Sequence, residues 1–263
     1  MKNWLKLAAI AVLVVGVGAA ALAMSGVWPR RSQADLEQAR VHTARANAHL
    51  QSGDQDAALR SLDESIRLYP LADAQSMRAS MRIGRNDFQG ALRDVSAVIG
   101  RGGRTAQNYS LRCWLRVRLD ALDRARADCD EALRLDPAHA SAFGNRGLIG
   151  LKRRHYRDAW EDFNAALRVG GSDQWVAWRL FGRGIAAWGQ GRVTQGRQDV
   201  ELALRANPGV AAAFAQFGLG VELMRELDDA AYAAAMSPRS LLALEQYLYL
   251  YPSGAHVTEA RAQ

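Results

Sequence analysis

A small residue recurs about every 34 positions along this chain, and this recurrence constrains the possible folds more than any other feature. One series, with intervals of 33, 34, 34, 37 and 34, is Ala46, Ala79, Cys113, Gly147, Gly184 and Gly218. A second series with the same intervals is Ala58, Ala91, Ala125, Ala159, Gly196 and Ala230. Two series that share one insertion indicate a tandem array of a single structural unit.

The repeated unit is predicted to be a pair of antiparallel helices. Two helices in a hairpin touch near their middles, where a side chain larger than Ala or Cys would push them apart. The chain is rich in Ala, Leu and Arg and has only six prolines, which favours an all-α fold. Pro70, Pro137 and Pro208 are expected to end second helices, and the loop 170–173 holds the three inserted residues.

The residues around these crossings resemble the tetratricopeptide-repeat (TPR) family over about residues 39–237. The fourth repeat matches best, through Asn145, Arg146, Gly147, Tyr156, Ala159, Phe163 and Ala166. The third carries Tyr109, Ala125, Ala132 and Leu135-Asp136-Pro137. The sixth is incomplete: Phe214, Gly218 and Ala230 fit, but Met236-Ser237-Pro238 is expected to cut its second helix short. The resemblance implies a right-handed superhelical solenoid of about five and a half hairpins.

Three regions follow from this interpretation. Residues 1–31 form an amino-terminal membrane or signal segment, residues 32–237 form the repeat array, and residues 238–263 form a helical cap. The repeats are placed near 39–71, 72–105, 106–139, 140–173 and 177–210, with a partial repeat at 211–237. The cap is expected because a solenoid needs a terminal element over its last hydrophobic face, and the apolar stretch 241–251 before Pro252 can supply it.

The amino-terminal segment has two interpretations. Lys2 and Lys6 precede an apolar stretch at residues 7–28, which as a helix would be about 33 Å long and would cross a bilayer. Alternatively it is a secretory signal cleaved near Ala23. We expect a single-pass bacterial inner-membrane protein with its repeats in the periplasm, or a periplasmic protein after cleavage. The membrane orientation rests on a short basic leader ahead of a long domain.

The charge of the chain does not indicate nucleic acid binding. The net charge is +7, but the arginines are dispersed among acids along the repeats, and no recognition motif accompanies them. One set keeps the repeat register: Arg45, Arg78, Arg112, Arg146 and Arg183, with Asp94, Asp128, Asp162 and Asp199. A charged binding surface is one explanation; a structural ion pair repeated in each hairpin is the preferred one.

No catalytic chemistry is apparent in the sequence. The five histidines lack metal-ligand spacing, and neither a phosphate-binding loop nor a nucleophile elbow occurs, so we predict no enzyme activity, no metal and no cofactor. Cys113 and Cys129 lie on the two helices of the third repeat. An axial offset of about 6 Å favours two buried thiols, with a disulfide as the alternative.

The resemblance implies a groove lined by first helices, in which an extended peptide or a partner helix lies. By register the lining residues are Trp114, Val117, Arg118, Leu148, Leu151, Lys152, Trp178, Phe181, Ile185 and Trp188. The alternative for Trp178 and Trp188 is packing against neighbouring helices or the cap. Chaperone-binding members of the family hold a terminal carboxylate with Lys, Asn and Arg on three successive first helices. The matching places here are Thr43, Asn47, Met77, Gln107 and Leu111, or, starting from the third repeat, Ser110, Trp114, Asn145, Trp178 and Gly182. Neither set favours chaperone-tail binding.

These observations predict a protein-interaction scaffold or adaptor, held at or exported across the inner membrane, that captures a peptide or helix of another protein. The alternative is an accessory or regulatory subunit of an envelope enzyme or assembly complex. The partner, the pathway and the oligomeric state are not specified by the sequence.

Overall fold

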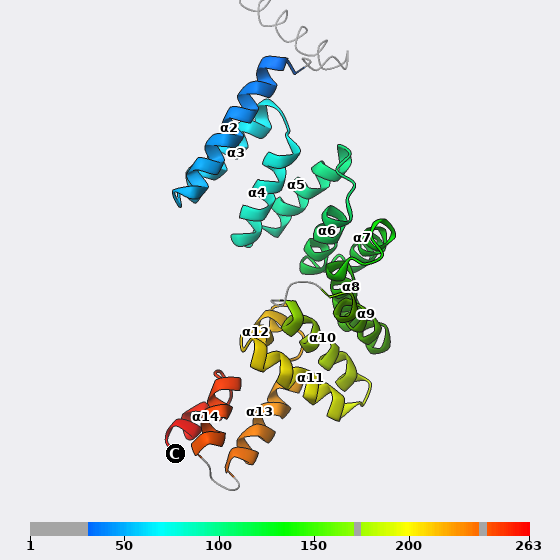
Figure 1. Ribbon diagram of the computed structural model, residues 1–263, viewed down its shortest axis with the longest axis vertical. Coiled ribbons are helices and arrows are strands. Elements are labelled where there is room, and N and C mark those ends of the chain that lie inside the picture. Colours follow the sequence, from blue (N-terminus) through cyan, green and yellow to red (C-terminus); the bar gives the residue numbers. More distant parts are fainter. Residues whose placement is uncertain (1–30, 171–174, 237–240) are drawn as a thin grey trace, which may run out of the picture. The chain divides into compact units, whose positions relative to one another are not determined.

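A computed structural model describes residues 31–170, 175–236 and 241–263, and all the regular structure in these ranges is α-helical (Figure 1). The helices form two compact units, one extending to Met77 and the other beginning at Arg78. The predicted membrane or signal helix at residues 7–28 lies outside the described residues. Within the described ranges, no helix has the length and apolar character needed to span a bilayer.

The first unit contains the hairpin of α2 (Gln33–Gln51) and α3 (Gln55–Leu68), and the start of α4 (Ala72–Gly84). Helix α2 begins with a capping box, in which Asp35 N–H donates to Ser32 Oγ and Ser32 N–H donates to the Asp35 carboxylate. The predicted crossing residues Ala46 and Ala58 are fully buried. In the first hairpin the position 16 residues after Arg45 is a serine, Ser61, and the aspartates of the series begin with Asp94.

The second unit continues the array in chain order. Helix α4 is followed by α5 (Phe88–Gly100); the next hairpins are α6 (Ala106–Arg118) with α7 (Leu122–Leu135), α8 (Ala140–Lys152) with α9 (Tyr156–Val169), and α10 (Val176–Gly189) with α11 (Val193–Ala206). The first helix of each repeat is therefore α4, α6, α8 or α10. Adjacent helices pack against one another from α5 to α11, which is the arrangement that the 34-residue spacing predicts.

The glycines at the helix crossings confirm why the recurring residue is small. A Cβ atom added at Gly184 would lie 2.7 Å from Val200 Cγ2 and 2.9 Å from the Gly196 carbonyl oxygen. A Cβ atom at Gly147 would lie 2.8 Å from the Phe163 ring. At Gly184 the facing backbone approaches too closely for any side chain, and at Gly147 the Phe163 ring fills the space that a side chain would need.

The carboxyl-terminal part differs from the predicted sixth repeat. Helix α12 (Val210–Ala215) stops early, and Gly218 has a φ of 71°, so this glycine lies in a turn and not at a helix crossing. The second helix, α13 (Val221–Met236), ends at Met236 as the sequence predicts, and it has 16 residues because it begins nine residues before Ala230. Helices α14 (Leu241–Leu250) and α15 (Val257–Arg261) follow, and α14 packs against α13.

Candidate functional site: a groove on the first helices

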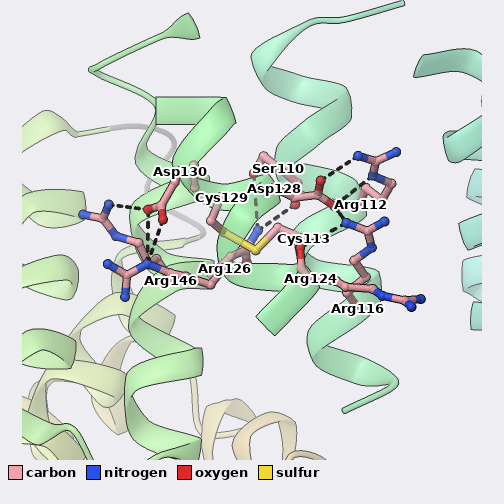
Figure 2. Close-up of a disulfide and its surroundings, with 12 residues drawn as sticks. Ser110, Arg112, Cys113, Arg116, Arg124, Arg126, Asp128, Cys129, Asp130 and Arg146 are labelled. Carbon is pink, nitrogen blue, oxygen red and sulfur yellow. Dashed lines mark hydrogen bonds and ion pairs between the residues drawn. A yellow bond between two sulfur atoms is a disulfide. The ribbon is translucent and has the colours of Figure 1, made fainter. Parts of the chain in front are cut away.

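The arginine and aspartate series forms ion pairs inside the hairpins of the second unit. Arg112 donates to Asp128 through Nε at 2.8 Å and Nη2 at 2.7 Å, and Arg116 donates to the same carboxylate at 2.6 Å (Figure 2). The equivalent pairs, each 16 residues apart, are Arg78 with Asp94, Arg146 with Asp162, and Arg183 with Asp199. The hydrogen bonds to Asp128 raise the pKa of Arg112. We call these four pairs the Arg/Asp ladder; because they join helices within hairpins, their role is structural.

The two cysteines form a disulfide, and the preference for two thiols was wrong. Cys113 on α6 and Cys129 on α7 are joined across the hairpin, with their Cα atoms 5.5 Å apart and both residues fully buried (Figure 2). The predicted axial offset is wrong because it assumes that Cys113 lies level with Ala125. The Cα–Cα distance of 5.5 Å shows that Cys129 itself lies opposite Cys113, within the range that a disulfide spans.

Half of the predicted groove residues belong to the hydrophobic core. Val117, Leu148, Leu151, Phe181 and Ile185 are each at most 5% exposed. These five residues belong to one core cluster with residues of the helices that follow, so they expose little surface to a partner.

The partly exposed members of the predicted set have identifiable neighbours. Arg118 lies between the rings of Phe88 and Phe217, 4.6 and 4.8 Å from their centroids, and donates to the Gln216 carbonyl oxygen. Lys152 forms an ion pair with Asp120 at 3.1 Å. Trp188 donates from its indole N–H to Glu226 on α13, which agrees with the packing alternative.

A second cavity lies at the carboxyl-terminal halves of α8 and α10. Residues 217–223, which form the turn after α12 and the first residues of α13, line this cavity of about 600 Å³ together with Leu151, Lys152, Ile185 and Trp188. At the amino-terminal half of α10, the Phe214 ring lies 4.9 Å from Phe181 and 5.1 Å from Trp178. Four of the predicted binding residues therefore share a cavity with a later segment of the same chain.

An open pocket remains at the amino-terminal halves of the same first helices. We call this pocket of about 320 Å³ the upper groove; it is lined by Ile83, Gln107, Ser110, Leu111, Trp114, Ala140, Ser141, Gly144, Asn145, Trp175, Trp178 and Arg179. Gln107, Leu111 and Trp114 are spaced by four and three residues, so they share one face of α6. Of the groove residues that the sequence predicts on α6, which are Trp114, Val117 and Arg118, Trp114 lines this pocket.

Two predicted residues, Trp114 and Trp178, do line the upper groove. Trp114 packs edge-on against Phe88, with ring centroids 5.7 Å apart, and is partly exposed. Trp178 packs on Phe163 and Phe214, and it closes over Gly144, where an added Cβ would lie 2.9 Å from the indole. Trp178 therefore packs in the core on one side and lines the pocket on the other. Trp175, Ile83 and Arg179 were not predicted as groove residues, although Trp175 stands next to the insertion that marks this repeat.

One cluster has the residue types of a metal site. The side chains of Asp228, Asp229 and His256 approach one another within 4.8 Å. The buried Asp228 accepts hydrogen bonds from Tyr247 Oη and from the Ala255 N–H, both at 2.7 Å, and His256 contacts Asp229 at 2.9 Å. These bonds fasten α14 and the following turn to α13, which gives the cluster a structural role.

Comparisons with known proteins identify the fold of this chain. No protein-family model matches the sequence. The chain is 35% identical over 130 residues to Tetratricopeptide repeat protein 36 of Bos taurus, covering 48% of this chain and 65% of that protein. It is 28% identical over 97 residues to Serine/threonine-protein phosphatase T of Aspergillus oryzae, covering 37% of this chain and 20% of the phosphatase. The matches thus span less than two thirds of either relative.

The structural comparison agrees with these sequence matches. The crystal structure of YrrB, described as a TPR protein with an unusual peptide-binding site, superposes with a TM-score of 0.52 at 15% identity. The match covers 68% of this chain and 91% of YrrB. Helix pairing in chain order, the small residues at the crossings and this superposition lead to one conclusion: the chain has the tetratricopeptide-repeat fold.

Proposed function

We propose that this protein is a non-catalytic interaction scaffold that binds a peptide or helix of a partner protein in the upper groove. One observation carries the proposal: the pocket is open to a ligand and is walled by Trp114, Trp175 and Trp178, of which Trp175 is 50% exposed. Tryptophan is enriched where binding energy is concentrated, because its large rigid surface is buried at a small entropic cost.

The size of the upper groove sets what it can hold. A pocket of about 320 Å³ is at the small end of the range for ligand sites and accommodates one or two side chains, not a whole helix. The partner therefore binds by inserting an anchor residue between the indoles. The rest of its segment lies along the exposed residues of α6 and α8, such as Gln107.

We also propose that the repeats face the periplasm, either tethered by residues 7–28 or released by cleavage near Ala23. The Cys113–Cys129 disulfide supports this location, because disulfides persist in oxidising compartments and are rare where glutathione keeps thiols reduced. A reporter enzyme fused after Gln263 tests the orientation. Activity of a reporter that works only on the cytoplasmic side would contradict it.

Site-specific photo-crosslinking tests the scaffold proposal. A photoreactive amino acid replaces Gln107, which is exposed and lines the groove, and in a matched variant it replaces Ala127, which is exposed on α7 of the same hairpin. The proposal predicts a defined protein adduct at position 107 in native membranes and none at position 127, with the partner read by mass spectrometry. Equal adducts at both positions, or none at either, would refute the assignment of the groove.

A further inference from the structure

Arg179 is a buried cation in the wall of the upper groove. The residue is 4% exposed, and its Nη1 donates to the carbonyl oxygen of Gly170 at 2.8 Å. Within residues 31–170, 175–236 and 241–263, no carboxylate is bonded to this guanidinium. Arg179 also lies close to the start of α10, where the positive end of the helix dipole disfavours a cation.

The partly buried arginines of the hairpins, in contrast, have carboxylate partners. In the Arg/Asp ladder, arginines whose side chains are 15–22% exposed each have an aspartate 16 residues later. Arg179 lies one turn before Arg183, the ladder residue of this hairpin, and the position 16 residues after Arg179 is Gln195, which carries no charge. Removing a charge from water is costly unless an opposite charge compensates it, and burial lowers the pKa of Arg179 accordingly. The most buried arginine of this unit is therefore the one to which the described residues offer a carbonyl oxygen and no acid.

We infer that the upper groove selects a peptide segment that carries a carboxylate for Arg179 and an apolar side chain for the space between Trp114 and Trp178. This inference rests on the proposed function, and it names the chemistry of the partner at the same site. Arg179 does not occupy any of the positions compared above with the chaperone-tail clamp, so this contact is a different one. An Asp or Glu side chain and a chain carboxyl terminus share the required chemistry.

Two further features of the groove suit such a segment. The pocket that Arg179 lines is largely apolar, through Ile83, Leu111 and the indoles, and a hydrogen bond to a charged group is stronger where water is excluded. Asn145 is 8% exposed and donates from Nδ2 to the Ser110 carbonyl oxygen at 3.0 Å, which orients its Oδ1 as an acceptor. That oxygen can accept an N–H of the bound peptide backbone.

Paired synthetic peptides test this inference with the full-length protein in detergent. The probes are fluorescein-labelled octapeptides with one Leu or Phe and one Asp or Glu two to four residues away. Each has a twin with Asn or Gln, and each is made with a free and an amidated carboxyl terminus. The dissociation constants come from fluorescence anisotropy. We expect the best acidic peptide to bind about 10- to 100-fold more tightly than its uncharged twin, the range for a hydrogen bond to a charged group. A preference among the amidated peptides identifies an Asp or Glu side chain as the source of the carboxylate. Tighter binding of the free than of the amidated peptides identifies the chain carboxyl terminus.

Substitutions assign the preference to Arg179. Arg179→Met should remove the difference between twins, Arg179→Lys should retain part of it, and Arg93→Met, at an exposed position on α5, should leave it unchanged. A preference that survives in Arg179→Met, or twins that bind the wild type equally, would overturn the inference. Since Arg179→Met can also lower stability, its folding is checked by circular dichroism, and the wild-type twins and Arg179→Lys decide the matter if it unfolds.

Two outcomes separate this inference from the function on which it rests. If no peptide of the set binds and photo-crosslinking at Gln107 also fails, the scaffold proposal is wrong. If peptides bind and Trp114→Ala weakens them without any charge preference, only the carboxylate assignment is wrong. Asp173 lies outside the described residues, and an Asp173→Asn variant tests it as an internal partner. A charge preference that appears only in this variant would show that Arg179 is already paired within the chain, and would overturn the inference.

Discussion

At the scale of single residues, the turn inside each hairpin keeps one backbone conformation while its residue type changes. Gly53, Asn86, Asp120, Arg154 and Gly191 all have positive φ values, between 58° and 81°, and they follow the intervals of the repeat. Glycine adopts this conformation without strain, whereas a residue with a Cβ atom does so at a cost. The sequence does not reveal this series, because only its first and last members are glycine.

The turn at Arg154 gives a direct test of this strain. Arg154 has a φ of 58°, so Arg154→Gly should raise the free energy of unfolding by about 0.5–1 kcal/mol. The matched control is Arg93→Gly inside α5, which should lower it by about 1 kcal/mol. Urea denaturation measures both. Destabilisation by both substitutions would contradict the account of the turn.

The Arg/Asp ladder predicts a large effect for a single aspartate. Asp128 is 3% exposed and accepts hydrogen bonds from Arg112 and Arg116, so Asp128→Ala leaves two partly buried guanidinium groups without their carboxylate. We expect a loss of about 3 kcal/mol in the free energy of unfolding. Glu131→Ala, which breaks an exposed pair with Arg134 on the same helix, is the control and should change stability little. Similar losses for the two variants would show that the ladder is not structural.

At the scale of elements, the hairpin of α6 and α7 combines the disulfide with the groove. The Cys113–Cys129 bond joins the helix that carries Trp114 to its partner helix, and it closes a loop with a sequence separation of 16. Reduction should lower the free energy of unfolding by about 3 kcal/mol, the value expected for a loop of this length. A Cys113→Ala/Cys129→Ala double variant should not respond to the reductant. Quantitative thiol labelling of the native protein before reduction would exclude the bond.

The carboxyl-terminal helices predict a loss of stability at high pH. Burial raises the pKa of Tyr251 to about 12, and burial with the hydrogen bond to Asp228 raises that of Tyr247. The folded protein then keeps protons that the unfolded chain releases from about pH 10, so stability falls as pH rises from about 10 to 12. Tyr251→Phe should reduce this fall, and the exposed Tyr249→Phe should not. Denaturation at several alkaline pH values measures the slope, and a flat profile in the wild type would contradict the assignment.

How far the sequence predicts these elements depends on which interactions set them. The helices of the hairpins from α4 to α11 are predictable, because each crossing needs a small residue at a fixed interval and that requirement is visible in the sequence. The end of the array is not, because the short α12 and the turn at Gly218 depend on how Phe214 packs on Trp178 and Phe181. The small-residue series includes Gly218, although α12 ends before this residue.

At the scale of the molecule, contacts from residues later in the chain determine where a pocket opens on the first helices. Register shows which face of a first helix is turned away from its own hairpin, but not which length of that face later residues cover. Residues 217–223 share a cavity with the ends of α8 and α10, and the upper groove lies at the starts of these helices. Arg179 escaped prediction for a related reason, because its burial depends on how α10 packs and no repeated position in the sequence indicates it.

The central claim is that a partner binds in the upper groove, and the indole N–H signals of the seven tryptophans test it most directly. The measurement is a proton–nitrogen NMR titration of protein labelled at tryptophan with the partner segment recovered by crosslinking, using single Trp→Phe variants for assignment. The account predicts that the signals of Trp114, Trp175 and Trp178 shift, while that of Trp160, on the second helix α9, does not. A titration that moves Trp160 and leaves the three groove signals unchanged would contradict it.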